Sequence, residues 1–392
     1  MRLDPPLKIL IAAGEVSSDR QAGYLARELL QQRTDIQLFG CGGGVMQAAG
    51  VDVRINTAQY GCIGMQESSR FSKQISRARE ELFALVRAEK PDLAVLVDSE
   101  HFNCDVAAFL HQQRIPFIYY LPPQAWLWGR WRARAIAKHS RLIIPAFRAE
   151  MELYRSKGGK GQWCGHPLVD LVKPEPAAEE ILRSVGLDPS LPIMAIMPGS
   201  RAQELEELAP TFLEAARQIK QRHPQLQLIL PVAAPHLATQ LQQAVHAAQL
   251  TTDIKLIEQQ VYTCLSQCDV VMLASGTATL EVALLGVPMV VAYRVKPLTY
   301  FIARRMLSTR FIAMPNILLG EAVVPELIQK HLSVERLVAE TLDILENPER
   351  RRWIRNQLRR IPPLLGTQGA IARAASLVLD EARLWYAVRQ TA

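Results

Sequence analysis

Short apolar runs alternate with helical stretches along this chain, and the alternation starts a second time halfway along. Runs of strand length stand at residues 8–13, 93–97, 117–121 and 142–146, and then at 193–197, 226–232, 254–257, 270–273 and 289–293. Strands that alternate with helices predict a parallel sheet covered by helices on both faces. Two such series in 392 residues predict an α/β protein with two Rossmann-like domains, whose parallel sheets face each other across a cleft.

The two series are separated by a segment that favours neither helix nor strand. Residues 165–176 (GHPLVDLVKPEP) contain one glycine and three prolines, which is typical of a linker. We therefore expect an N-terminal domain over residues 1–164 and a C-terminal domain over residues 177–350. Residues 351–392 have a helical pattern, and we expect these helices to pack back on the N-terminal domain.

Composition narrows the class of partner. Lys and Arg exceed Asp and Glu by 45 to 38, a net charge of +7, which suits an acidic partner such as a nucleotide or a phospholipid. Six cysteines without a CxxC pair indicate reduced thiols and no metal site. No apolar segment reaches the roughly 20 residues of a membrane span, and the first residues lack a signal-peptide pattern. We expect a cytoplasmic protein, at most attached to a membrane surface.

Two motifs in the first half follow predicted strands. Gly14 to Asp19 (GEVSSD) can turn sharply and begin a helix, so that backbone N–H groups face a ligand. A helix cap explains this run equally well. Asp98 ends the strand at 93–97, where a general base would lie, although it could also cap the next helix. No GxGxxG fingerprint is present, which disfavours a nicotinamide cofactor.

Two further motifs follow strands of the second half. Gly199, Ser200 and Arg201, with Glu204 nearby, bring amides and a guanidinium to bear on a diphosphate. The small residues of 273–281 (LASGTATLE) let a phosphate approach the backbone, and Glu281 could accept both ribose hydroxyls. No Walker A sequence occurs. A phosphate cradle in one domain and a base in the other predict a sugar-nucleotide transferase.

These motifs, in this order, resemble the landmarks of bacterial lipid-A-disaccharide synthases. The resemblance spans roughly residues 7–330 and weakens in the tail. It rests on the runs AGEVSSD, GGGVMQAAG, IGMQE, VDSEHFN, PPQAWLW, GHPLVD, PGSRAQELEEL, LASGTATLE, YRVKPLTYFIARRM and MPNILLG.

The resemblance implies a GT-B glycosyltransferase that is inverting and needs no metal. It would move 2,3-diacylglucosamine from UDP to the 6-hydroxyl of 2,3-diacylglucosamine 1-phosphate, giving the lipid A disaccharide precursor and UDP. The UDP-sugar is then a substrate, and no cofactor is expected. The resemblance also implies a peripheral enzyme at the inner face of the cytoplasmic membrane, and a homodimer is a further expectation.

The family's functional residues carry over to matching positions. Asp98 is the expected catalytic base, and Glu15 is the second residue expected to be catalytic. The expected substrate-binding residues are Ser17, Asp19, Gly199, Ser200, Arg201, Glu204, Ser275, Gly276, Thr277, Glu281 and Asn316.

The sequence departs from the family at several points. Ser18 stands where the family has glycine, and residues 98–103 (DSEHFN) lack the usual proline and second aspartate. Residues 66–76, an apolar segment in the family, are mostly polar here, so the acyl-chain surface is thin. Trp126, Trp128 and Trp131 interleave with basic residues, which favours a membrane interface or a solvated helix face over nucleic acid.

Three alternatives follow from these departures. The chain could be a UDP-sugar 2-epimerase, a transferase with a less hydrophobic acceptor, or a catalytically inactive relative.

The arginine cluster at residues 350–360 is interpreted as a solvated helix with a role at a domain or subunit contact.

Overall fold

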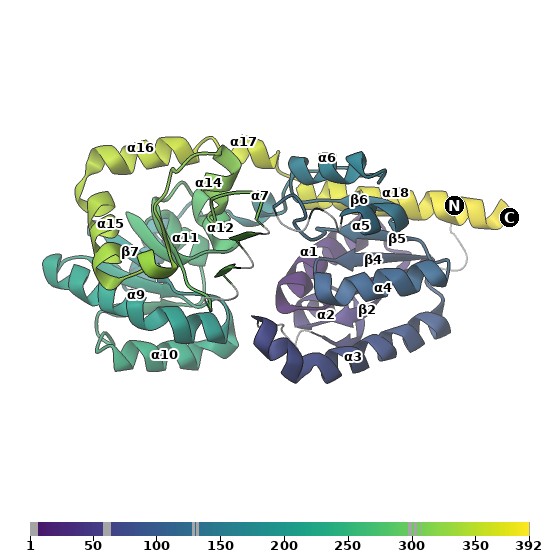
Figure 1. The fold of residues 1–392 in the computed structure, drawn as a ribbon, viewed down its shortest axis with the longest axis horizontal. Helices are drawn as coiled ribbons and strands as arrows, with labels where there is room; N and C mark the ends of the chain where they lie inside the picture. The colour runs from purple at the N-terminus through teal and green to yellow at the C-terminus, as the bar shows by residue number, and fades with distance from the viewer. Residues whose placement is uncertain are drawn as a thin grey trace. The chain divides into compact units, whose positions relative to one another are not determined.

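Each half of the chain builds its own six-stranded parallel sheet (Figure 1). The computed structural model describes residues 7–57, 64–127, 130, 133–296, 300–301, 304–305 and 307–391. The chain divides into two compact units. Unit 1 comprises Met1–Asp170 and Leu365–Ala392, and unit 2 comprises Leu171–Leu364. The predicted α/β class with two Rossmann-like domains is confirmed.

The sheet of unit 1 has the order β3-β2-β1-β4-β5-β6. Its strands are β1 (Leu7–Ala13), β2 (Ile36–Gly42), β3 (Asp52–Asn56), β4 (Leu93–Val97), β5 (Phe117–Tyr120) and β6 (Leu142–Ile144). Its helices are α1 (Val16–Gln32), α2 (Gly44–Ala48), α3 (Gly64–Glu89), α4 (Glu100–Gln112), α5 (Ala133–His139), α6 (Arg148–Ser156) and α18 (Ala370–Thr391). All strand pairs are parallel.

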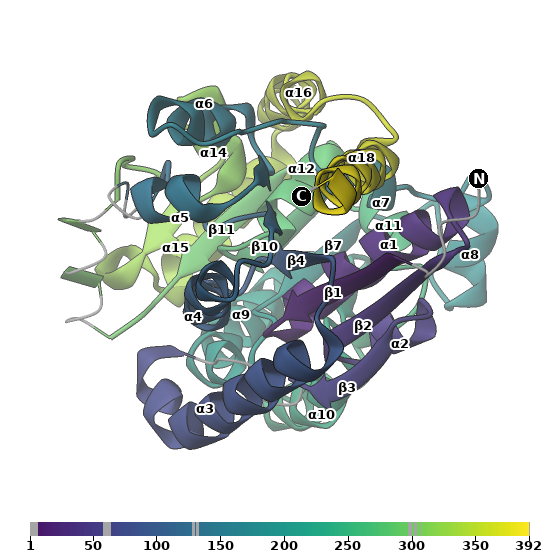
Figure 2. The ribbon, with the colours of Figure 1, turned by 90° about the vertical axis from the view of Figure 1, so that its right-hand side faces the viewer.

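Alternation along β1 divides the core of unit 1 between the two faces of the sheet. Leu7, Ile9 and Ile11 pack with side chains of α1 and α18, whereas Leu10 and Ala12 pack with α3 and α4. Figure 2 shows these two helix layers on either side of the sheet. Because both faces are covered, the strand is apolar at nearly every position, which explains why it reads as a continuous apolar run.

The sheet of unit 2 has the order β12-β11-β10-β7-β8-β9. Its strands are β7 (Ile193–Met197), β8 (Gln227–Pro231), β9 (Ile254–Ile257), β10 (Val270–Ala274), β11 (Met289–Tyr293) and β12 (Glu326–Ile328). Its helices are α8 (Ala178–Ser184), α9 (Ala202–Arg222), α10 (Ala238–Ala247), α11 (Val261–Ser266), α12 (Ala278–Leu284), α14 (Met314–Leu319), α15 (Val334–Glu346), α16 (Pro348–Leu358) and α17 (Pro362–Leu365). The short helix α7 (Leu168–Leu171) lies where the chain passes from unit 1 to unit 2.

The division of the tail differs from the expected one. The boundary expected at residue 350 falls inside α16, which stays with unit 2 because Ile354 and Leu358 are fully buried and Arg350 forms ion pairs with Asp343 and Glu340 of α15. The chain leaves unit 2 at Leu364 instead.

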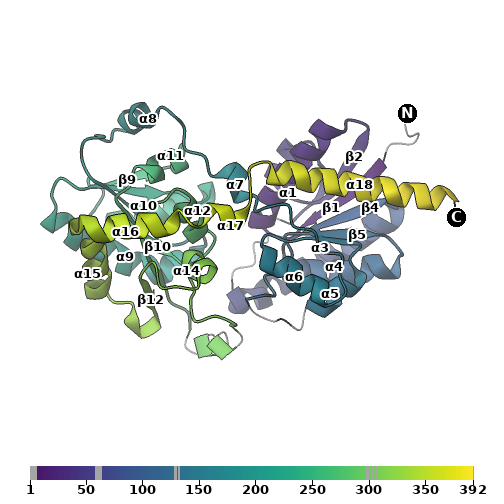
Figure 3. The same ribbon diagram turned by 90° about the horizontal axis from the view of Figure 1, so that it is seen from above.

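Only the last helix of the tail belongs to unit 1. Figure 3 shows α18 alongside α1, and Ser376 of α18 donates a hydrogen bond to the side chain of Gln32 in α1 (2.9 Å). The Asp170 carboxylate accepts hydrogen bonds from the N–H groups of Gly369 (2.6 Å) and Ile371 (2.8 Å) at the start of α18. The first part of the expected linker, up to Asp170, is therefore built into unit 1.

In each sheet, the first three strands are added toward one edge, and the next three are added on the other side of the first strand, toward the opposite edge. In unit 1 the strand order changes direction between β1 and β4, and in unit 2 between β7 and β10. The crevice beyond the carboxyl ends of strands at such a reversal is the usual ligand site of doubly wound folds. The topology therefore points to the loops after β1, β4, β7 and β10.

Candidate functional site

The loops after β1 and β4 are joined by hydrogen bonds. The Gly14 N–H donates to Ser99 Oγ (2.9 Å), and the Ser99 hydroxyl donates to Ser18 Oγ (2.7 Å). Ser18 and Ser99 are both buried. These bonds join residues that are 85 and 81 positions apart in the sequence. The motifs after β1 and β4 therefore lie together at the reversal point of unit 1.

Asp98, the expected base, occupies an uncommon backbone conformation. Both Asp98 (φ 47°) and Ser99 (φ 49°) are left-handed, which costs free energy for residues other than glycine and needs surrounding bonds to persist. Those bonds come from Tyr119 Oη (3.0 Å) and Asn103 Nδ2 (2.9 Å), which both donate to the Asp98 carbonyl. The side chain of Asp98 is half-buried at the carboxyl end of β4.

Ser18, which stands in place of the family's glycine, has a defined role. Its hydroxyl donates to the Glu15 carbonyl (2.8 Å) and accepts from the Glu15 N–H (2.9 Å) as well as from Ser99. These bonds satisfy the single donor and both acceptor positions of the hydroxyl. The serine therefore closes the first turn of α1 and ties it to the Asp98 loop.

The structure separates the three other expected residues of this motif. Ser17 is exposed and Glu15 is half-buried at the start of α1. Asp19 is 3% exposed, and its carboxylate accepts hydrogen bonds from the N–H groups of Gly43 (2.7 Å), Val45 (3.1 Å) and Met46 (3.1 Å). Asp19 thereby caps α2. Because three of its acceptor positions are filled by backbone, the geometry gives this side chain a structural role.

A buried carboxyl that the sequence did not reveal lies near Asp98. Glu150, in the first turn of α6, is fully buried. Its Oε2 accepts from the Phe147 N–H (3.2 Å), and its Oε1 has no hydrogen-bond partner within the described ranges. Burial raises the pKa of Glu150 to about 8, and the nearby charge of Asp98 acts in the same direction. The neutral form of Glu150 is therefore favoured at neutral pH.

In unit 2, the loop after β7 has a conformation that requires glycine. Gly199 has a φ of 151°, and a Cβ at this position would lie 2.5 Å from Glu204 Cβ. The Glu204 carboxylate accepts from the Ser200 N–H (2.9 Å) and from the Arg201 guanidinium (3.4 Å). Glu204 thus orients the loop from the first turn of α9, while half of the Arg201 side chain stays exposed.

The loop after β10 is open where a phosphate would need to approach. Gly276 and Thr277 are exposed, and a Cβ at Gly276 would meet nothing within 4 Å. Ser275 donates its hydroxyl to the Ile312 carbonyl (2.8 Å). Glu281, one turn into α12, is half-buried and accepts a hydrogen bond from Tyr262 Oη (3.2 Å). The sequence analysis did not single out Tyr262, which lies beside Glu281, the residue expected to accept the ribose hydroxyls.

The side chain of Asn316 forms hydrogen bonds within unit 2. It is fully buried. Its Nδ2 donates to the Val324 carbonyl (2.9 Å) and to Glu326 Oε1 (2.8 Å), and its Oδ1 accepts from the N–H groups of Val323 and Val324. Four bonds exhaust the capacity of an amide side chain. Asn316 therefore holds the loop before β12 against α14.

The expected membrane contacts are described only in part. Trp128, Trp131 and the side chains up to Ser72 in segment 66–76 lie outside the described residues. In the described part, Lys73 and Gln74 are exposed, and Ile75 packs against the core of unit 1. Trp126 is half-buried and also packs against that core, with its ring 5.6 Å from that of Phe147. Among the described residues, no helix is long and apolar enough to cross a bilayer.

Comparison with known proteins identifies the class of this fold and then the family. Its architecture is that of GT-B glycosyltransferases and related epimerases. UDP-GlcNAc 2-epimerase of Neisseria meningitidis bound to UDP-GlcNAc has a TM-score of 0.64 at 13% identity, covering 95% of this chain and 99% of that one. Anabaena Alr3699/HepE in complex with UDP has a TM-score of 0.56 at 15% identity, covering 96% and 100%.

Sequence similarity is much stronger to one family. The model of lipid-A-disaccharide synthetase matches residues 9–376. Lipid-A-disaccharide synthase of Geobacter sulfurreducens is 36% identical over 373 residues, covering 95% of this chain and 97% of the relative. The enzyme of that name from Neisseria meningitidis serogroup C is 32% identical over 375 residues, with 95% and 97% covered. The chain belongs to the lipid-A-disaccharide synthase family, a family of glycosyltransferase enzymes.

Proposed function

We propose that this protein transfers 2,3-diacylglucosamine from UDP to the 6-hydroxyl of 2,3-diacylglucosamine 1-phosphate. The observation that carries the proposal is the coincidence of motifs and topology. The loops at 14–19 and 98–103 flank the reversal point of one sheet, and those at 198–204 and 275–281 flank that of the other. Family membership supplies the substrate class.

In this proposal unit 2 binds the UDP portion of the donor. The open backbone at Gly276 and the exposed guanidinium of Arg201 suit a diphosphate, since an arginine bonds two phosphate oxygens at once. Glu281 accepts the ribose hydroxyls. Positive charge from Arg201 and the backbone amides stabilises UDP as it leaves, so that no metal ion or cofactor is required.

Unit 1 supplies the base. The Asp98 carboxylate takes the proton of the 6-hydroxyl while that oxygen attacks the anomeric carbon of the donor sugar. The new glycosidic bond forms as the bond to the β-phosphate of UDP breaks, and UDP leaves with the electron pair. A single displacement from the opposite face inverts the anomeric configuration.

The direct test is an assay with both acylated substrates. The purified protein is incubated with UDP-2,3-diacylglucosamine and 2,3-diacylglucosamine 1-phosphate, and the disaccharide is detected by mass. We expect one UDP released for each disaccharide. UDP released without acceptor, or no disaccharide with any chain length, would contradict the proposal.

The Asp98→Asn variant tests the base. This variant keeps the size of the side chain and the backbone bonds that hold residue 98. We expect turnover to fall by at least about 10² while the affinity for UDP stays within about twofold, because Asp98 belongs to unit 1. Asp380→Asn, the same change at an exposed aspartate of α18 outside the motifs, serves as the matched control. Turnover retained by Asp98→Asn would rule out Asp98 as the base.

The epimerase alternative rests on a specific observation, since solved UDP-GlcNAc 2-epimerases share this fold. Their identity to this chain is 12–15% in the comparisons given, against 36% for the Geobacter synthase. Incubation with UDP-GlcNAc alone separates the two reactions, because an epimerase forms the 2-epimer without any acceptor.

Attachment at the inner face of the cytoplasmic membrane and a homodimer complete the proposal. Membrane flotation and light scattering test them.

A further inference from the structure

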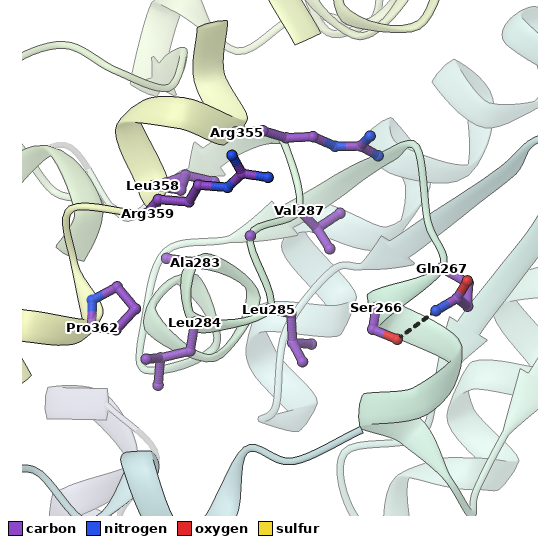
Figure 4. A pocket seen from close by; sticks show the side chains of 11 residues that line it. Ser266, Gln267, Ala283, Leu284, Leu285, Val287, Arg355, Leu358, Arg359 and Pro362 are labelled. Carbon is purple, nitrogen blue, oxygen red and sulfur yellow. Dashed lines mark hydrogen bonds between the residues drawn. The ribbon is translucent and has the colours of Figure 1, made fainter. Parts of the chain in front are cut away.

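A cavity of about 460 Å³ lies in unit 2 away from the loops described above (Figure 4). It is formed where α11 and α12 end and α16 passes over them. Its lining residues are Ser266, Gln267, Ala283, Leu284, Leu285, Gly286, Val287, Arg355, Leu358, Arg359 and Pro362. The turns that line it lead into β10 and β11 at their amino ends, whereas the donor loops leave β7 and β10 at their carboxyl ends. The cavity is therefore separate from the proposed donor site.

Two arginines make the lining of this cavity positively charged. Arg355 and Arg359 lie one helical turn apart on α16, and Figure 4 shows both side chains extending over the cavity. No acidic side chain occurs among its described lining residues. Within the described part of the chain, neither guanidinium has an ion pair. Arg359 has only a 3.4 Å bond to the neutral Asn356 side chain.

Other arginines of residues 350–360 have partners, except the exposed Arg352, which forms no ion pair among the described residues. Arg350 forms ion pairs with Asp343 and Glu340, Arg351 donates to the Leu345 carbonyl (2.7 Å), and Arg360 forms an ion pair with Glu321. The two arginines that line the cavity are like charges one helical turn apart, with Arg355 half-buried and Arg359 exposed. Like charges one turn apart on a helix repel each other modestly, and a bound negative charge would relieve this repulsion.

The ends of two helices compensate this charge only in part. The carboxyl end of a helix carries at most about −0.5 of an elementary charge, so α11 and α12 together supply about −1 against two positive guanidinium groups. Roughly one positive charge is left over. A guanidinium binds phosphate oxygens in pairs, and a cavity of this size is in the range of small-ligand sites.

We propose that this cavity binds a phosphate-bearing anion, held by Arg355 and Arg359 and oriented by Ser266 and Gln267. The proposal is independent of the catalytic one. The phosphate could belong to a small soluble ester or to the headgroup of an anionic lipid. Because Trp353 and Leu364 on the same stretch are each 45% exposed, a lipid arm is included in the test.

The test compares two variants that lose the same charge. Arg355→Gln/Arg359→Gln removes the cavity pair, and Arg351→Gln/Arg352→Gln removes two charges from the same helix outside the cavity. In the soluble arm, the melting temperature is followed with inorganic phosphate and with glycerol 3-phosphate. We expect both ligands to raise it in the wild type and the control, and the rise to be at least threefold smaller in the cavity variant. The single variant Arg355→Gln replaces the double one if the latter does not fold.

In the lipid arm, co-sedimentation is measured with phosphatidylcholine vesicles with and without phosphatidylglycerol. Loss of a basic residue near an anionic surface weakens binding by about fivefold without any specific site, so both variants lose affinity. A loss at least fivefold larger in the cavity variant identifies the lipid headgroup as a source, and an effect in the soluble arm alone identifies a soluble ester. Equal behaviour of the two variants in both arms, or no response in the wild type, would overturn the proposal.

Turnover keeps this test separate from the proposed function. The two variants should release UDP at the wild-type rate within about twofold in detergent micelles, because neither pair touches the donor loops. If no protein, including the wild type, makes disaccharide, then the proposed function fails while the result on the cavity stands.

Discussion

At the scale of single residues, two motif side chains that were expected to bind substrate bond mainly to the backbone of the protein itself. Both are buried: Asp19 accepts three backbone hydrogen bonds, and Asn316 bonds to three backbone groups and to the Glu326 side chain. The sequence could not reveal this, because a polar residue beside a motif looks the same whether it binds a ligand or caps a helix. The bonds of Asp19 come from residues 24 to 27 positions away, and only the fold brings those partners near.

Glu150 illustrates the opposite case, a buried carboxyl without a motif. Its position follows from the turn after β6, where its side chain bonds to the Phe147 N–H. As the third residue of α6, it occupies the position of a capping-box glutamate, although Phe147 stands where that sequence signal has Ser or Thr. Nothing in the sequence distinguishes this glutamate from an exposed one, because its burial depends on packing by distant segments.

The pH dependence of stability tests the burial of Glu150. Its pKa is raised from 4.5 to about 8 in the folded protein, so its contribution to stability is complete below pH 4.5 and is lost as the pH rises through 8. Between these values the slope reaches about 1.4 kcal/mol per pH unit. Glu150→Gln cannot titrate, so its free energy of unfolding relative to the wild type should increase from pH 5.5 to 7.5 in urea denaturation. Glu152→Gln, an exposed change in the same helix, should show no such trend, and an identical trend in both variants would contradict the assignment.

At the scale of elements, the strands that the sequence revealed are the ones buried on both faces. Strands β1, β4, β5, β7 and β10 read as apolar runs because helices cover both sides of each sheet. The predicted strand runs did not include β2, β3 or β12. Strand β3 (DVRIN) lies at an edge and exposes alternate residues, and β12 has three residues. Such strands are defined by their pairing partner and carry too little apolar signal to be predicted.

Alanine substitutions at two glycines of the donor loops test two different requirements, the backbone conformation at Gly199 and the access of the ligand at Gly276. Gly199→Ala forces a Cβ against Glu204 in a left-handed backbone, so we expect a loss of stability of about 1–3 kcal/mol and a higher KM for the donor. Gly276→Ala has open space, so we expect unchanged stability and a raised KM, because the methyl group obstructs the approaching phosphate. Melting curves and steady-state kinetics distinguish the two. An unchanged KM in Gly276→Ala would show that the diphosphate does not approach this loop.

At the scale of the whole molecule, the chain passes between its units twice, near Asp170 and near Leu364. The sequence predicted two domains from the restart of the strand pattern. It placed the second boundary too early, because a proline at the start of α16 reads as a break although proline is well tolerated at the first position of a helix. The buried face of α16, in contact with unit 2, sets the actual boundary.

The attachment of α18 gives a prediction at this scale. Asp170→Ala removes the carboxylate that caps α18, which should cost about 0.5–2 kcal/mol. Because α18 packs on α1, hydrogen exchange should increase in α18 and α1 and remain unchanged in β7 and β10. The affinity for UDP should stay at the wild-type value. Increased exchange throughout unit 2, or loss of UDP binding, would show that the two units do not respond separately.

The central claim is that UDP is held by the loops at the reversal point of the second sheet. Hydrogen–deuterium exchange of the full-length protein with and without UDP measures this directly. We expect UDP to slow exchange at residues 198–204 and 275–281 and to leave residues 14–19 and 98–103 unchanged until acceptor is added. Protection confined to other segments, with the two donor loops unaffected, would contradict the account.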